Sequence, residues 1–239
     1  MANQDHKFDC MICGSPLVYI TGSEKRKCVI CGNVYETNCV CEQGHYICDK
    51  CHAKPALVVI TAQALQTKSD NPIEIAMQMM DDQRVHMHGP EHHYLVPAAL
   101  LAAYYNAGGS FGSSTLSDVL GIAQLRAAQV PGGVCGSWGC CGAAVGAGIF
   151  TSIISGSTSM SDESWGLCNR ITAKCLDIIG KNGGPRCCKR DSFLAISLMV
   201  NYVAEHFGIQ MAKTSPLICH YSQYNRACRK EKCPFFPRD

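Results

Sequence analysis

Two CxxC motifs near the amino terminus have the clearest chemistry in this chain. Cys10 and Cys13 form the first motif, and Cys28 and Cys31 form the second after a gap of fourteen residues. Two such pairs can supply four thiolates to one tetrahedral ion, and this spacing is typical of a structural zinc site. Gly14 and Gly32 would permit the tight turn after each motif.

A second set of thiols follows closely, and His45 or His52 could replace one thiolate in it. Few aliphatic side chains occur in residues 1–53, so metal must contribute their folding energy, on the order of 10 kcal/mol per site. We predict two zinc ions here, with iron as the alternative. Residues 1–55 carry six basic and six acidic residues and so have no net charge, which favours a structural clip over an RNA-binding or protein-binding surface. The second set consists of Cys39, Cys41, Cys48 and Cys51.

The carboxyl-terminal part contains adjacent cysteine pairs in glycine-rich sequence and a final Cys-Pro. The side chains of two adjacent cysteines point apart, so they do not both fit one zinc site. Both can be ligands of a larger metal cluster. Free glycine amides can donate to sulfide, so we predict one or two iron–sulfur clusters of the four-iron type. Core packing is the alternative role for these thiols, and the preferred one for Cys168 and Cys175. The candidate cluster ligands are Cys135, Cys140, Cys141, Cys187, Cys188, Cys219, Cys228 and Cys233.

Two further groups could act on a substrate. Residues 86–93 hold four histidines and a glutamate, which could transfer protons or bind a catalytic metal; a solvated turn is the alternative. We expect burial to raise the pKa of the glutamate, and the helix dipole to stabilise a thiolate at Cys140 or Cys141. The candidate catalytic residues are His88, Glu91, His92 and His93. The candidate anion-binding residues are Arg186, Lys189 and Arg190, which could instead offset the cluster charge or simply favour solubility.

Helical patterns dominate beyond residue 56 and predict a mainly α fold. We expect a small zinc-ribbon-like β/loop module at 1–53, a helical connector at 54–85 and a helical cysteine-rich cluster domain at 86–239. Pro97 should kink its helix and free the carbonyl of His93. The expected helices span 72–80, 90–106, 114–129, 141–155, 161–179 and 191–207.

The overall composition limits the function classes. Eighteen cysteines in 239 residues, with no secretory signal at residues 1–10, favour a cytoplasmic protein whose thiols bind metal. The net charge of +2 argues against a nucleic-acid binder that works by bulk electrostatics. No 18-residue stretch is continuously apolar, so we expect no membrane segment.

The strings HMHGPEHHYLVPAALL, VPGGVCGSWGCCGAAVGAGIF and GGPRCCKRDSF, with Cys219 and the CPFF segment, resemble an uncharacterised cysteine-rich domain family of anaerobic archaea and bacteria. The resemblance implies an amino-terminal zinc-ribbon-like part, an oxygen-sensitive metalloprotein, and radical-SAM or methyl-transfer proteins as partners. It implies no particular reaction. The radical-SAM triad CxxxCxxC is absent from this chain.

Two hypotheses follow. The first is an iron–sulfur enzyme or enzyme subunit, in which the cluster adjoins the histidine and glutamate group and acts on a small anionic substrate. The second is a non-catalytic accessory protein that carries a cluster or binds RNA or protein through its zinc module, with RNA the less favoured partner.

Overall fold

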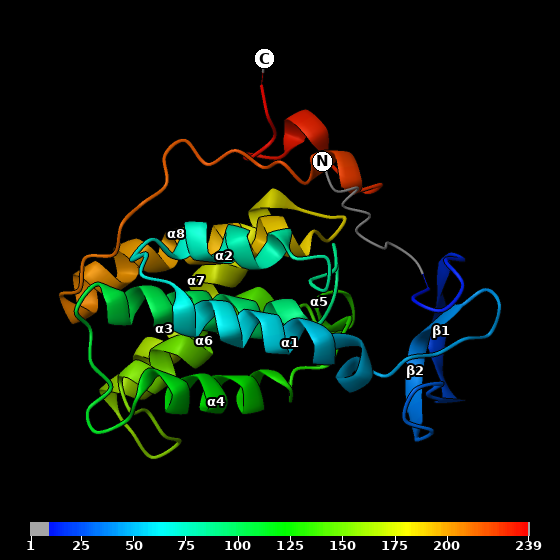
Figure 1. Ribbon diagram of the computed structural model, residues 1–239, viewed down its shortest axis with the longest axis horizontal. Helices are drawn as coiled ribbons and strands as arrows, with labels where there is room; N and C mark the ends of the chain where they lie inside the picture. Colours follow the sequence, from blue (N-terminus) through cyan, green and yellow to red (C-terminus); the bar gives the residue numbers. More distant parts are fainter. Residues whose placement is uncertain (1–9, 239) are drawn as a thin grey trace.

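A small hairpin module and a larger helical body make up the protein. The computed structural model describes residues 10–238. In the module, β1 (Leu17–Lys27) pairs antiparallel with β2 (Val34–Cys41), and a bulge interrupts the register between Tyr19 and Glu24. Figure 1 shows this hairpin at one end of the helical body. The expected mainly α fold is therefore confirmed, with a small two-stranded sheet at its amino-terminal side.

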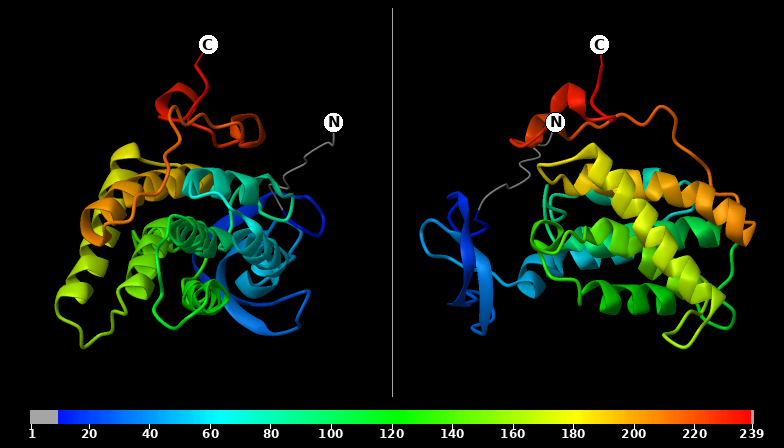
Figure 2. Two further views of the ribbon diagram at one scale, coloured as in Figure 1. Left: turned by 60° about the vertical axis from the view of Figure 1, so that its left-hand side comes forward. Right: turned by 180° about the vertical axis from the view of Figure 1, so that it is seen from behind.

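One buried helix, α3, forms the centre of the helical body. Fourteen of its sixteen residues are buried. Apolar side chains occur on all faces of this helix, so they avoid water only where other helices pack around it. It packs against α1, α2, α4, α6 and α8, while α7 packs on the outside against α6 and α8 (Figures 1 and 2). The helices are α1 (Asp49–Gln66), α2 (Pro72–Asp81), α3 (Glu91–Asn106), α4 (Leu116–Ala127), α5 (Val134–Ser137), α6 (Gly142–Ile154), α7 (Glu163–Asn182) and α8 (Cys188–Phe207).

Most helix boundaries agree with the sequence prediction to within a few residues. Asn71 caps α2 as expected, because its side chain accepts hydrogen bonds from the amides of Ile73 and Glu74. The exceptions are α5, which no expected helix covers, and α1, which begins at Asp49 and crosses the expected boundary at residue 53 without a break. Residues 51 and 52 therefore belong to a helix that continues from the module into the helical body.

The carboxyl-terminal segment folds back over the helical body. After α8 it has little regular structure, apart from short 3-10 helices at Ser222–Tyr224 and Lys230–Lys232 (Figure 2). It is attached to α2, where the Tyr221 hydroxyl donates to the Asp81 carboxylate at 2.7 Å. Among the described residues, no helix combines the length and the apolar character that a membrane crossing requires.

Candidate functional site

The first candidate metal group lies in the hairpin module. The ligand atoms of Cys10, Cys13, Cys41 and His45 all lie within 4.8 Å of one another. The Cys13 and Cys41 sulfurs are 3.5 Å apart, and the Cys13 sulfur is 3.3 Å from His45 Nδ1. Tetrahedral zinc with bonds of about 2.3 Å to sulfur separates two ligand atoms by about 3.8 Å. The group is therefore close to the size that one tetrahedral ion needs.

The second candidate group consists of four thiols. Cys28, Cys31, Cys48 and Cys51 again have all four ligand atoms within 4.8 Å, and the Cys31 and Cys48 sulfurs are 3.8 Å apart. Cys51 lies in the first turn of α1, so the helix delivers the last ligand. Both groups could hold a metal ion.

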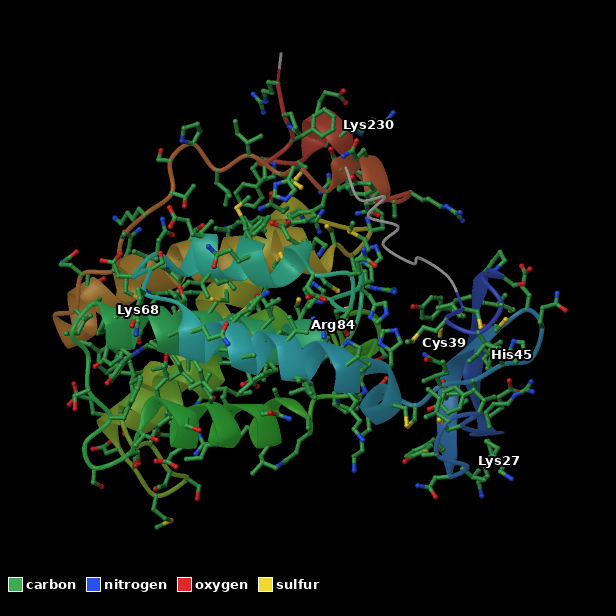
Figure 3. All side chains as sticks on the ribbon, viewed as in Figure 1. Lys27, Cys39, His45, Lys68, Arg84 and Lys230 are labelled. Carbon is green, nitrogen blue, oxygen red and sulfur yellow. The ribbon has the colours of Figure 1, made fainter. Side chains whose placement is uncertain are left out.

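The pairing of motifs differs from the one expected from the sequence. Cys10 and Cys13 do not share a group with Cys28 and Cys31; alternate motifs pair instead. The hairpin explains the difference, because it places Leu17 opposite Cys41 and so brings the first and third motifs together. Cys39 lies outside both groups. Figure 3 shows Cys39 and His45 on the hairpin module.

Backbone amides around these sulfurs have the geometry of a metal-binding turn. The Ile12 amide donates to the Cys10 sulfur at 3.4 Å, and the Gln43 amide donates to the Cys41 sulfur at 3.3 Å. Burial would raise the pKa of Cys28, but amide hydrogen bonds outweigh it and lower this pKa to about 6. Cys28 therefore favours the thiolate form that metal binding requires. Burial instead raises the pKa of Cys41, and burial together with the neighbouring thiols raises the pKa of Cys51 to about 12.

A buried carboxylate lies where the module joins the helical body. Glu91 is the first residue of α3 and is fully buried. Its Oε1 accepts a hydrogen bond from the His86 amide at 2.9 Å and lies 3.1 Å from His86 Nδ1, while its Oε2 lies 3.6 Å from His52 Nδ1. Burial raises the pKa of Glu91, but His52 and His86 lower it well below the usual range. The expected upward shift is therefore wrong, and Glu91 is an anion rather than a proton donor.

The three candidate catalytic histidines have different surroundings. His92 is fully buried, and burial lowers its pKa to about 3. His88 Nε2 lies 3.3 Å from Asn225 Oδ1 in the carboxyl-terminal segment, and burial lowers the pKa of His88 to about 4. His93 Nδ1 lies 3.1 Å from the Val130 carbonyl. All three rings are therefore neutral near pH 7. The sequence analysis placed His86 in the same group as Glu91 without naming it as a candidate catalytic residue. It placed His52 with the second thiol set, so it missed His52 as a partner of Glu91.

Four of the eight candidate cluster cysteines line one cavity. A small cavity of about 20 Å³ lies between α8 and the carboxyl-terminal segment. Amides point at the sulfurs here as well: the Arg190 amide donates to the Cys187 sulfur at 3.5 Å and the Lys230 amide to the Cys228 sulfur at 3.4 Å. The four cysteines that line this cavity are Cys187, Cys219, Cys228 and Cys233.

The remaining four candidates lie outside that cavity lining, at or near the beginnings of helices. The Cys141 thiol lies 4.0 Å from Asp191 Oδ2, and burial together with this carboxylate raises the pKa of Cys141 to about 12. The expected dipole-stabilised thiolate at Cys141 is therefore wrong. Burial also raises the pKa of Cys188, the first residue of α8. Cys135 and Cys140 are half-buried at α5 and just before α6. Cys175, by contrast, is buried in the core as predicted, whereas Cys168, for which the same role was predicted, is only half-buried.

The predicted anion-binding residues are largely engaged within the protein. Lys189 is fully buried, donates to the Met80 carbonyl at 3.2 Å and lies over the Tyr221 ring. Arg190 is buried and donates to Asp191 Oδ1 at 2.9 Å. Arg186 packs against the Tyr19 ring of the module. Lys189 and Arg190 also line the cysteine cavity, so they contribute positive charge to it.

Comparison with known proteins identifies a family but no characterised relative. Residues 60–236, which are 177 of the 239 residues, match the model of a family of unknown function, DUF5714. No curated protein and no solved structure matches the chain. The match begins inside α1, covers the rest of the helical body and most of the carboxyl-terminal segment, and leaves out the hairpin module.

Proposed function

We propose that this chain, which belongs to the DUF5714 family of unknown function, is a cytoplasmic iron–sulfur protein and acts as an enzyme or enzyme subunit of anaerobic metabolism. Cys187, Cys219, Cys228 and Cys233 would hold a four-iron cluster, and the two amino-terminal groups would hold structural zinc. The observation that carries the proposal is the convergence of these four cysteines on one cavity.

The local surroundings of the four cysteines support a cluster. Thiolates of a four-iron cluster each bind a different iron, so they stand farther apart than the ligands of one ion. Amide hydrogen bonds to the sulfurs of Cys187 and Cys228 would stabilise the thiolates. Lys189, Arg190 and Arg229 line the cavity and would offset the negative charge of a thiolate-ligated cluster.

A polar connection links the cavity to the candidate catalytic histidines. The Asn225 side-chain amide lies 3.6 Å from the Cys187 sulfur, and its carbonyl oxygen lies 3.3 Å from His88 Nε2. Asn225 therefore spans the distance between a proposed cluster ligand and the histidine segment. A cluster supplies electron transfer or Lewis acidity when it is bound. The neutral His88 ring could then accept a proton from a small anionic substrate.

Anaerobic metal analysis tests the cluster. We expect full-length protein, reconstituted with iron and sulfide, to hold four iron atoms, to show broad visible charge-transfer absorption, and to give a paramagnetic resonance signal on reduction. Cys219→Ser and Cys228→Ser should lose the iron. Cys168→Ser is the matched control, because Cys168 lies on α7 outside the cavity lining. Iron content that is unchanged in both cavity variants, or a wild-type protein with zinc alone, would refute the cluster assignment.

A second candidate function is an accessory protein that delivers its cluster to a protein partner, such as a radical-SAM or methyl-transfer protein. The hairpin module favours this accessory function, because six large apolar side chains in the module are 39 to 60% exposed and could contact a partner. These are Ile12, Leu17, Val18, Val29, Ile30 and Val34. Residues 10–53 carry four basic and four acidic side chains, and this neutral charge favours a protein partner over RNA.

Cluster lability distinguishes the two functions. A carrier should transfer its iron to an apo-ferredoxin acceptor within minutes, whereas an enzyme should retain it. Val29→Asp with Ile30→Asp provides a second measurement, because it should abolish transfer if the module docks the partner. Unchanged transfer in this double variant would count against docking through the module.

A further inference from the structure

We propose that His52, His86 and Glu91 hold a third divalent metal ion, of the zinc or ferrous type, at the joint between the hairpin module and the helical body. This site is separate from the two thiol-rich groups and from the cysteine cavity. Its three ligands come from α1, from the segment between α2 and α3, and from the first residue of α3.

The positions of the ligand atoms support a mononuclear site. One ligand atom from each of the three residues lies within 4.8 Å of the others, and the two imidazole rings are 4.4 Å apart between centroids. Two imidazoles and one carboxylate are a common donor set for zinc and non-haem iron, and they leave coordination positions open.

Two buried polar atoms without hydrogen-bond partners are an independent reason to expect a metal ion here. Glu91 Oε2 and His52 Nδ1 are both buried and lack a hydrogen-bond partner among the described residues, although they face one another at 3.6 Å. A buried carboxylate oxygen without a partner is costly, and an ion between these two atoms would satisfy both. Glu91 itself is fully buried.

The backbone leaves room for this arrangement. A Cβ atom on Gly89 would lie 2.1 Å from Glu91 Oε2, so only glycine allows the carboxylate to occupy its place. His52 is the most exposed of the three ligands, with 24% of its side chain accessible, and therefore provides the route to solvent. The open positions of the ion would face this route and could take water or a small anionic ligand.

The site would also connect the two parts of the protein. His52 follows Cys51, a member of the second thiol group, on the same helix turn. An ion bound at His52 would thus tie α1 to the beginning of α3. A purely structural alternative is a His–Glu–His contact without metal, in which Glu91 remains an ion-paired anion.

Cobalt titration separates the two possibilities. Full-length protein whose thiol groups are loaded with zinc is titrated with Co²⁺ and followed by paramagnetic resonance and visible absorption. We expect one saturable equivalent of high-spin Co²⁺ without thiolate-to-cobalt charge transfer, because its ligands are nitrogen and oxygen. His86→Gln and Glu91→Gln should bind this equivalent at least tenfold more weakly. His206→Gln is the matched control, since His206 lies at the far end of α8.

The outcomes are distinct from those of the cluster experiment. Wild-type protein that binds no Co²⁺ equivalent of the nitrogen and oxygen type overturns the third site, whatever the colour of the protein. Equal Co²⁺ affinity in wild-type protein and both variants also overturns it. If a variant loses its zinc or its helical circular dichroism, the wild-type titration alone decides, because it requires no substitution.

Discussion

Removal of metal should unfold the hairpin module and leave the helical body intact. Between Cys10 and Cys48, five side chains are buried, and four of them belong to the two metal groups; Val40 is the only apolar side chain left to form a core. Burial of one valine contributes about 2 kcal/mol, whereas one structural zinc ion contributes on the order of 10 kcal/mol. We therefore expect the module to unfold when its metal ions are removed.

Hydrogen exchange with mass spectrometry provides the assay. Anaerobic, reduced protein is compared before and after chelation, and peptides from β1 and β2 should lose all protection while peptides from α3 keep theirs. Protected β1 and β2 amides in metal-free protein would refute the reasoning, because they would show a source of stability other than the ions.

The interleaved pairing can be tested in the same preparation by counting bound ions with native mass spectrometry. Cys13→Ser and Cys41→Ser should each remove one ion, and the double variant should also remove only one, because both residues belong to the same group. Cys13→Ser with Cys31→Ser should remove two. Loss of two ions in the Cys13 and Cys41 double variant would contradict the pairing.

Three further predictions concern packing and the cavity. Gly142→Ala should destabilise the protein by about 1–3 kcal/mol in urea unfolding, because its Cβ would lie 2.0 Å from the His93 ring. The matched change Gly121→Ala should stabilise it by about 0.5–1 kcal/mol, because nothing lies within 4 Å of that Cβ. Stability changes of the same sign in the two variants would contradict the packing argument. Asn71→Ala should lower the free energy of unfolding by about 2 kcal/mol in the same assay, because it removes a helix cap and the 2.9 Å hydrogen bond from Asn71 to Thr214. A decrease below about 0.5 kcal/mol would contradict this role of Asn71. Lys189→Met should make the reduction potential of the cluster more negative in a redox titration, because a buried cation favours the reduced cluster. An unchanged reduction potential would show that Lys189 does not act on the cluster.

Local patterns predicted the helical body well because most of its helices are strongly marked in the sequence. The Asn71 and Pro72 cap places the beginning of α2, and Gly208 follows the end of α8. The close approach at Gly146 was also predictable: a Cβ there would lie 3.1 Å from the His93 carbonyl, which Pro97 leaves without its helical partner. Helix α1 was harder, because it begins inside a metal group and its start has no capping side chain.

The sequence by itself determined which residues can bind metal, since thiols and imidazoles are recognisable by type and short spacing. Tertiary structure decided which of them meet. The hairpin register places Leu17 opposite Cys41 and so brings the Cys13 sulfur to 3.5 Å from the Cys41 sulfur. Helix α1 carries His52 toward Glu91. The return of the chain after α8 brings Cys219, Cys228 and Cys233 to Cys187. These contacts join residues far apart in the chain, and only the packing of whole elements sets such distances, so no local pattern could have specified them.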